Sequence, residues 1–289
     1  MFVARQDQAE TLSANMAVIA ELTEDMKPIS ITEANERAPI LRPDYVAAAA
    51  YDDSTKDMDV NAIHSGYLRG AKKEGVSIVT DAQVTALKHN SDRWYVQTKA
   101  GEFQAPVVVN AAGAWADQIG ELAGARTIGL VPKRRTAIVV DAPEHCDLST
   151  WCAVADAEEQ WYYKPDAGQI LASPADETPV PAQDIQPDEL DIATLVDRLQ
   201  RATSLDIKRI NRSWAGLRSF VEDHCPVVGF APDREGFFWL AGQGGYGIQT
   251  SYAMGKTAAA LIQGNPVPEE ITKFGVTSEQ LGPMRLWRD

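Results

Sequence analysis

The chain contains few cysteines and few histidines. Its 289 residues include three cysteines, Cys146, Cys152 and Cys225, and no Cys-x-x-Cys pair. An odd number of widely spaced cysteines predicts reduced thiols rather than a disulfide framework. We therefore expect a protein of a reducing compartment. A metal site is not expected, because ligand spacing is also absent from the four histidines, His64, His89, His145 and His224.

Long apolar runs and an excess of basic residues are also missing. No run approaches the ~20 residues of a membrane-spanning helix. Arg5, Asp7 and Glu10 stand where a secretory signal would need an apolar core. Acidic residues outnumber basic ones by 41 to 27, so the net charge is −14. This balance disfavours nucleic acid and anionic membranes as partners. We expect a cytoplasmic protein without a membrane span.

What the chain does contain is a glycine-rich turn between two apolar elements. A strand predicted at 237–241 runs into a segment, 242–247, in which four of six residues are glycine, and a helix is predicted at 248–263. Glycine permits positive φ and close backbone approach. The start of a helix offers free N–H groups at the positive end of its dipole. The pattern predicts a site for an electron-rich ligand; the alternative is a structural turn.

Two expectations concern the C-terminal region in particular. The predicted helix has a narrow apolar stripe at spacings near 3.6, which we expect to be buried against a sheet. We expect the polar, proline-bearing tail, 266–289, to lie at the surface. The residues of the stripe are Ile248, Tyr252, Gly255, Ala259, Leu261 and Ile262.

The whole pattern predicts a mixed α/β (α+β) fold in two interleaved parts. One part, 57–125 and 225–265, alternates helices and strands and includes a buried parallel strand that enters a second turn within 106–116. The other part, 1–56 and 129–222, contains short aromatic strands separated by Pro, Asp and Gly, which are typical of an antiparallel sheet. Because the chain leaves one part and returns to it, we expect a site where the two meet.

Several elements are also predicted within the first part. A helix is predicted at 60–73, followed by strands at 76–80 and 84–87, and the pattern at 94–104 predicts a hairpin.

Three polar side chains are candidates for binding an anion. Arg218 lies in the apolar segment 214–220, and Arg135 enters another apolar strand at 132–138. A guanidinium among apolar residues needs an anionic partner, and two of them can clamp one carboxylate. Tyr162 could add a hydroxyl. The alternative is that each arginine pairs with a structural acid and that Tyr162 packs in the sheet.

Several segments together resemble one protein family. They include Val-Val-Val-Asn-Ala-Ala-Gly-Ala-Trp at 107–115, Trp-Ala-Gly-Leu-Arg at 214–218 and the glycine-rich segment 239–250. On these segments the chain resembles the FAD-dependent D-amino-acid oxidase/dehydrogenase family, which includes glycine and sarcosine oxidases. It is most similar to bacterial D-arginine dehydrogenase-like enzymes on further segments, at 62–70, 132–135, 162–168 and 186–193.

The resemblance implies a Rossmann-like FAD-binding domain beside a substrate domain with a large antiparallel sheet. It implies that Arg135, Tyr162 and Arg218 hold the carboxylate of a small amino-acid substrate beside the flavin. It places Val84 near the adenine of FAD. Residues implied at the ribityl-diphosphate are Ala111, Ala112 and Gly113, and those implied at the pyrimidine end of the flavin are Gly244, Gly245, Tyr246, Gly247, Ile248, Gln249 and Thr250.

The sequence departs from this family at one point. Its members begin with a strand, a G-x-G-x-x-G turn and a helix that bind the ADP half of FAD, and this chain has no such unit. Three explanations are open: a start upstream of Met1, a complementing N-terminal flavoprotein chain, or an inactive remnant. We expect a bare sheet edge and exposed apolar surface, with weak or absent FAD binding and poor folding of the chain alone.

The sequence therefore predicts an FAD-dependent oxidoreductase that converts a D-amino acid, of the D-arginine type, to its imino acid. A sarcosine- or glycine-oxidase-like activity is the alternative within enzymes. A non-catalytic subunit or remnant of a split flavoprotein is the alternative outside them.

Overall fold

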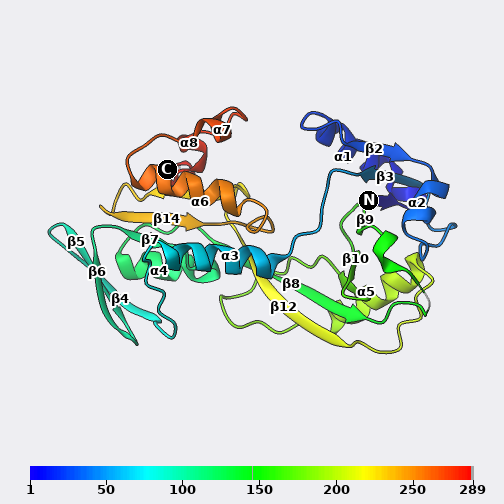
Figure 1. Ribbon diagram of the computed structural model, residues 1–289, viewed down its shortest axis with the longest axis horizontal. Coiled ribbons are helices and arrows are strands. Elements are labelled where there is room, and N and C mark those ends of the chain that lie inside the picture. Colours follow the sequence, from blue (N-terminus) through cyan, green and yellow to red (C-terminus); the bar gives the residue numbers. More distant parts are fainter. Residues whose placement is uncertain (145, 288–289) are drawn as a thin grey trace. The chain divides into compact units, whose positions relative to one another are not determined.

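The computed structural model describes residues 1–144 and 146–287, which form two compact units (Figure 1). Unit 1 comprises Met1–Asp57, Arg134–Thr178 and Asp184–Gly216. Unit 2 comprises Met58–Lys133, Pro179–Gln183 and Leu217–Asp289. In the described residues, no helix combines the length and the apolar character needed to cross a membrane.

Unit 1 is built on an eight-stranded sheet with the order β12-β8-β11-β10-β9-β1-β3-β2. Strands β8, β11, β10 and β9 pair antiparallel, as the sequence predicts for this region, and β1 joins β9 in parallel. The strands are β1 (Phe2–Ala4), β2 (Met26–Ile29), β3 (Ala48–Asp52), β8 (Val131–Val140), β9 (Val154–Asp156), β10 (Tyr162–Asp166), β11 (Gln169–Ser173) and β12 (Arg212–Phe220).

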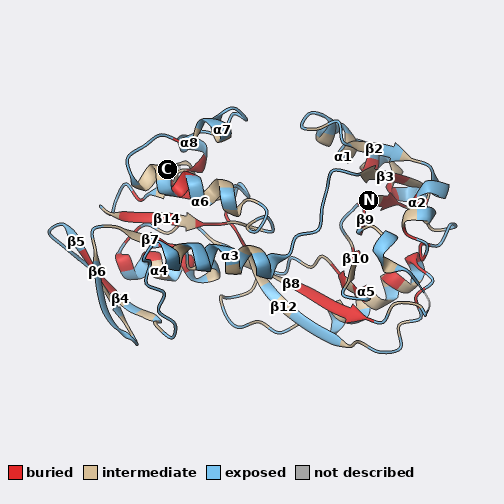
Figure 2. Cartoon of the chain, viewed as in Figure 1, coloured by how far each residue is buried: buried red, intermediate tan, exposed pale blue. Residues whose placement is uncertain are grey.

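The core of unit 1 lies between this sheet and the helices of the unit. Ile138, Tyr163 and Ile170 from the strands and Leu195 and Leu199 from α5 have no exposed surface. Figure 2 shows a red, buried stretch along β8. The helices are η1 (Gln6–Gln8), α1 (Ala9–Ala20), α2 (Ile31–Arg37), η3 (Leu148–Thr150) and α5 (Glu189–Ala202).

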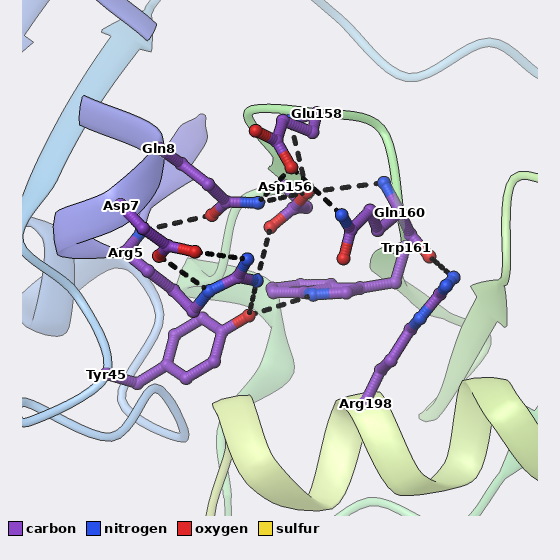
Figure 3. A network of polar contacts seen from close by, with 9 residues as sticks. All are labelled: Arg5, Asp7, Gln8, Tyr45, Asp156, Glu158, Gln160, Trp161 and Arg198. Carbon is purple, nitrogen blue, oxygen red and sulfur yellow. Dashed lines mark hydrogen bonds and ion pairs between the residues drawn. The ribbon is translucent and has the colours of Figure 1, made fainter. Parts of the chain in front are cut away.

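A buried polar network joins the start of the chain to the turn between β9 and β10 (Figure 3). Asp156 has no exposed surface. One carboxylate oxygen accepts hydrogen bonds from Gln8 Nε2 at 3.0 Å and from the amides of Glu158 and Gln160 at 3.1 and 3.3 Å. Arg5 Nη1 lies 3.9 Å from the other oxygen. The buried charge is therefore compensated by donors from two distant parts of the sequence.

Unit 2 contains two three-stranded sheets, with the orders β13-β14-β7 and β4-β5-β6. β14 pairs with β7 in parallel, so the parallel strand predicted within 106–116 is present. It is not buried as predicted, because it lies at the edge of its sheet with Val109 42% exposed. The hairpin predicted at 94–104 is also present. The elements are α3 (Val60–Lys73), β4 (Val84–Asn90), β5 (Arg93–Thr98), β6 (Gly101–Ala105), β7 (Val108–Asn110), η2 (Gly113–Trp115), α4 (Ala116–Ala123), β13 (Val227–Phe230), β14 (Phe237–Ala241), α6 (Ser251–Ile262), α7 (Glu269–Thr272), α8 (Ser278–Leu281) and η4 (Pro283–Leu286).

The predicted apolar stripe of α6 is confirmed only at its end, where Leu261 and Ile262 pack against the cluster that contains Phe238. Its earlier part is wrong. Tyr252 is 65% exposed and Ile248, ahead of the helix, is 41% exposed. The buried residues of α6 are instead Thr257 and Ala258, and Ala258 packs in a cluster with Phe238 of β14. The small alanines that follow fit either face of a helix, so the apolar pattern did not determine which face meets the sheet.

The predicted strand at 76–80 is also wrong. Residues 76–79 have no regular structure, and Val76, Ile78 and Val79 are 42–54% exposed. A strand needs a neighbour to bond its backbone groups, and in the described part of the chain none pairs with this segment. None of the fourteen residues of the preceding α3, all described, is buried (Figure 2).

The C-terminal segment is largely exposed over 268–280, as its polarity predicts, but it is anchored at both ends of that stretch. Val267 and Leu281 are buried. Arg285, 11% exposed at its side chain, donates to the carbonyl oxygens of Leu281 at 2.8 Å and Cys225 at 2.7 Å, and to both carboxylate oxygens of Asp223 at 2.6 and 3.1 Å. These bonds fasten the segment to the turn before β13.

Acidification should weaken this attachment. Hydrogen bonds from Arg285 hold the pKa of the Asp223 carboxyl below its usual range. The stabilisation is therefore complete above the unfolded pKa of about 4 and is lost as the pH falls through the lower, folded value. We expect the melting-temperature difference between the wild type and Asp223→Asn to stay nearly constant above about pH 5 and to shrink as the pH falls below about 4. A difference that does not change with pH would contradict this account.

Candidate functional site

The glycine turn of unit 2 follows β14 and folds against β12. The amide of Gly244 donates to the Ser219 carbonyl oxygen at 2.9 Å, and Gly244 has φ +55°. A Cβ at this position would lie 2.7 Å from the ring of Phe220, which is itself buried. Only glycine therefore allows the turn to lie this close to the strand.

A cavity of about 350 Å³ opens beside this turn. Its volume falls in the range of small-molecule and cofactor sites. It brings together four of the predicted FAD contacts, Ala111 and Gly113 from the second turn and Gly244 and Gly247 from the glycine turn. The complete lining is Ala111, Gly113, Ala114, Leu217, Ser219, Leu240, Ala241, Gly242, Gln243, Gly244, Gly247, Ser251, Met254 and Gly255.

The other predicted FAD contacts do not line this cavity. Ala112, Gly245, Tyr246, Ile248, Gln249 and Thr250 are neighbours of lining residues in the same two turns. Val84 lies in β4 and packs against the core of unit 2. The roles predicted for these residues stay predictions.

The helix that follows the turn begins later than the sequence predicts. α6 starts at Ser251, and the amides of Tyr246 and Thr250 already donate to the carbonyl oxygens of Gln243 and Tyr246 at 3.1 and 3.0 Å. Within the described part of the chain, the amides of Gly245, Gly247, Ile248 and Gln249 find no acceptor. Donors for an electron-rich ligand therefore come from the turn itself rather than from the first turn of a helix.

Arg218 belongs to the same part of unit 2. It lies in β12, and a Cβ on Gly245 would lie 2.7 Å from its Nη1. The guanidinium thus packs directly against the backbone of the glycine turn. Its sequence neighbours Leu217 and Ser219 line the cavity, whereas Arg218 does not. The guanidinium meets Gly245, which follows the lining residue Gly244.

Arg135 and Tyr162 lie in unit 1, on one face of its sheet. Ala172 of β11 pairs with Tyr163 of β10 on one side and with Ile138 of β8 on the other. All three side chains are fully buried on the core face of the sheet. Side chains alternate along a strand, so Arg135 and Tyr162 point to the opposite face, with β11 between their strands. The neighbouring Tyr163 differs, because burial raises the pKa of its hydroxyl and keeps it neutral.

The two consecutive arginines of β8 have different surroundings. Arg134 pairs with Asp191 at 2.7 Å and with Asp176 at 3.4 Å. The alternative of a structural ion pair therefore holds for Arg134. Arg135 Nη2 donates to Glu177 at 2.9 Å, while its Nε is buried and has no partner among the described residues. On the Nε–Nη2 side of the Arg135 guanidinium, only Nη2 therefore donates a hydrogen bond.

Some lining residues were not predicted. Ser219, Gln243, Ser251 and Met254 contribute the polar and flexible parts of the wall. Gln243 lies within the glycine segment and Ser219 directly follows Arg218. Their position next to these two motifs could have indicated that they line the site. Met254 lies outside the predicted stripe of its helix, and the pattern gave no signal for it. Of the four histidines, His145 lies outside the described residues, and the described residues contain no cluster of ligands for a metal ion.

Comparison with known proteins gives the class of the chain. The family described as "DAO: FAD dependent oxidoreductase" matches residues 1–261. Glycine oxidase of Geobacillus kaustophilus is 25% identical over 276 residues, which are 94% of this chain and 71% of that protein. Hydrogen cyanide synthase subunit HcnC of Pseudomonas aeruginosa is 28% identical over 72% of this chain, but the match spans only 49% of HcnC.

The solved structures agree on the fold. L-proline dehydrogenase from P. horikoshii superposes with a TM-score of 0.82 at 22% identity, covering 98% of this chain and 75% of that one. The mixed α/β fold with its antiparallel sheet is thus the fold of FAD-dependent oxidoreductases. The chain belongs to the DAO family of FAD dependent oxidoreductases.

The residues of the unit 2 cavity fit the cofactor of this family, FAD. The glycine turn offers unpaired amides in the described chain, and the cavity wall contains three of its glycines without side chains. Backbone N–H groups of this kind bind electron-rich atoms without a charged side chain. Gly244, Gly247, Ala111 and Gly113 would hold the cofactor, which supplies a two-electron acceptor when bound.

Proposed function

We propose that this protein oxidises an amino acid at its amine-bearing carbon, with FAD as the hydride acceptor. The observation that carries the proposal is the packing of Arg218 against Gly245, beside the cavity that fits the cofactor. A carboxylate bound by that guanidinium would lie next to the bound ring system. Arg135 and Tyr162 would complete the binding of the carboxylate and fix the orientation of the α-carbon.

The substrate that we propose is a D-amino acid, with basic D-amino acids such as D-arginine first. This choice rests on the segments that resemble D-arginine dehydrogenase-like enzymes. Glycine or sarcosine is the alternative, since one relative is a glycine oxidase and another is a sarcosine dehydrogenase.

Anaerobic bleaching of the flavin absorbance distinguishes these substrates. We expect D-arginine or D-lysine to bleach flavin bound to the protein, and glycine and sarcosine to act more slowly. Bleaching by glycine or sarcosine alone would favour the alternative. A flavin-loaded protein that none of these compounds reduces would contradict the proposal.

A second proposal is that this chain associates with a complementing polypeptide that supplies an N-terminal strand and helix. Three observations in unit 2 favour it. β7 lies at the edge of its sheet with Val109 42% exposed, the helix α3 buries none of its residues, and the apolar segment 76–79 is exposed and unpaired. Added strands would bond to that edge and segment and cover the helix. The relative HcnC is by its name a subunit of an enzyme.

Hydrogen exchange can test the association. We expect the chain alone to bind FAD weakly and to take it up when the N-terminal strand–glycine turn–helix unit of a related flavoprotein is added. The amides of 76–79 and β7 should then gain protection, while those of β6 stay unchanged. Tight FAD retention by the chain alone, or uptake without protection at β7, would contradict this proposal.

A further inference from the structure

A short segment after β11 folds back along β8 and presents a carboxylate to Arg135. We call this segment, residues 174–178, the return segment. Its Ala175 has φ +54°, a conformation that costs energy for a residue with a side chain. The amide of Ala175 donates to Ser173 Oγ at 3.1 Å, which helps to fix the reversal.

The return segment is anchored on both sides of Glu177. On one side, Asp176 accepts hydrogen bonds from the Thr136 amide at 2.6 Å and from the Thr136 hydroxyl at 3.0 Å. On the other side, the Thr178 carbonyl oxygen accepts from the Arg134 amide at 2.9 Å. The backbone of Glu177 is therefore held opposite Arg135, while its side chain stays partly exposed.

The two partners of the ion pair between Arg135 and Glu177 differ in their exposure to solvent. The Arg135 side chain is 10% exposed, whereas that of Glu177 is 41% exposed. Only Nη2 of Arg135 reaches the carboxylate, at 2.9 Å, and the buried Nε has no partner in the described chain. A carboxylate that engaged both Nε and Nη2 would bind better than Glu177 does, and the exposed Glu177 can turn away toward water.

We propose that Glu177 competes with ligand carboxylates for Arg135 and thereby selects ligands that also carry a positive charge. The inference rests on the proposed role of Arg135 in binding a carboxylate. A simple carboxylic acid would take Arg135 and leave Glu177 without that partner. An amino acid replaces both halves of the ion pair, because its carboxylate takes Arg135 and its ammonium or basic side chain can pair with Glu177. Glu177 is thus a specificity-determining residue against carboxylic acids that carry no positive charge.

Binding calorimetry with propionate and D-alanine, which differ by the amino group, tests this inference on the full chain. We expect the wild type to prefer D-alanine, and Glu177→Gln to bind propionate about tenfold more tightly and to lose most of the preference. Glu177→Ala should behave like Glu177→Gln. Glu10→Gln, which removes an exposed charge from α1, should leave both affinities unchanged.

The outcomes separate the inference from the proposed function. Arg135→Gln should weaken both ligands; equal binding by that variant and the wild type would contradict the proposed role of Arg135. If Arg135→Gln weakens both ligands but Glu177→Gln leaves their ratio unchanged, only the competition by Glu177 is wrong. Failure of propionate to bind to either the wild type or Glu177→Gln would overturn the competition as well.

Discussion

Replacing Asp156 by alanine is expected to destabilise unit 1 by about 3–5 kcal/mol, because the buried Gln8 amide and two partly buried backbone amides would lose the charged acceptor that they share. The carboxylate has no exposed surface, and one of its oxygens accepts from Gln8 and from the amides of Glu158 and Gln160 (Figure 3). No other group in the network replaces it for those amides. Urea unfolding monitored by tryptophan fluorescence measures the change, since Trp161 lies beside the network.

Two variants serve as controls for this prediction. Asp7 also pairs with Arg5, at 3.0 Å, but its side chain is 70% exposed. Asp7→Ala should therefore leave the stability nearly unchanged, because solvent screens an ion pair at the surface. Asp156→Asn keeps one acceptor oxygen but turns an amide toward Arg5, so its effect should be intermediate. Equal stability of Asp156→Ala and Asp7→Ala would show that the network contributes little.

Gly244→Ala is expected to cost about 2–4 kcal/mol and to abolish cofactor uptake. Its φ of +55° disfavours any side chain, and the new Cβ would lie 2.7 Å from the buried ring of Phe220. Either the ring or the turn must move, and the turn forms the cavity wall. Thermal unfolding and FAD titration, with the complementing unit present, measure the two effects. Unchanged FAD affinity would contradict the placement of the cofactor.

The neighbouring glycine should respond differently. A Cβ on Gly245 would meet Nη1 of Arg218 at 2.7 Å, the far end of a flexible side chain. Gly245→Ala should therefore leave the stability nearly unchanged, displace the Arg218 guanidinium and weaken carboxylate binding. Gly216→Ala is the matched control, because nothing lies within 4 Å of its added Cβ. Loss of carboxylate affinity in both variants alike would argue against a specific role for Arg218.

Local patterns predicted those elements that their own residues determine. The strand β14 occupies the predicted residues Phe237–Ala241, and its parallel pairing with β7 follows from the apolar run at 107–109. The sequence also predicted the hairpin of β5 and β6, because its turn and its alternating residues lie within a few positions of each other.

The incorrect predictions share a physical cause. Residues 76–79 have the composition of a strand, but a strand needs a second segment to pair with its backbone. In the described chain no segment pairs with these residues. The C-terminal segment is polar in sequence, yet four hydrogen bonds from Arg285 to Asp223, Cys225 and Pro226, together with the burial of Leu281, attach it to the turn before β13. In both cases the outcome depends on partners far away in the sequence.

The sequence by itself predicted the glycine turn from its glycine spacing, which is a local property of the chain. The resemblance of several sequence segments gave the family and the candidate residues for the cofactor and the carboxylate. Only the tertiary structure decided which of these residues share one cavity, that Arg134 is held by aspartates, and that Arg135 faces Glu177. Ion pairs and cavity walls depend on which strands become neighbours, and the return segment reaches Arg135 only because β11 pairs with β8. That pairing is fixed by the packing of the whole sheet rather than by any one segment of the sequence.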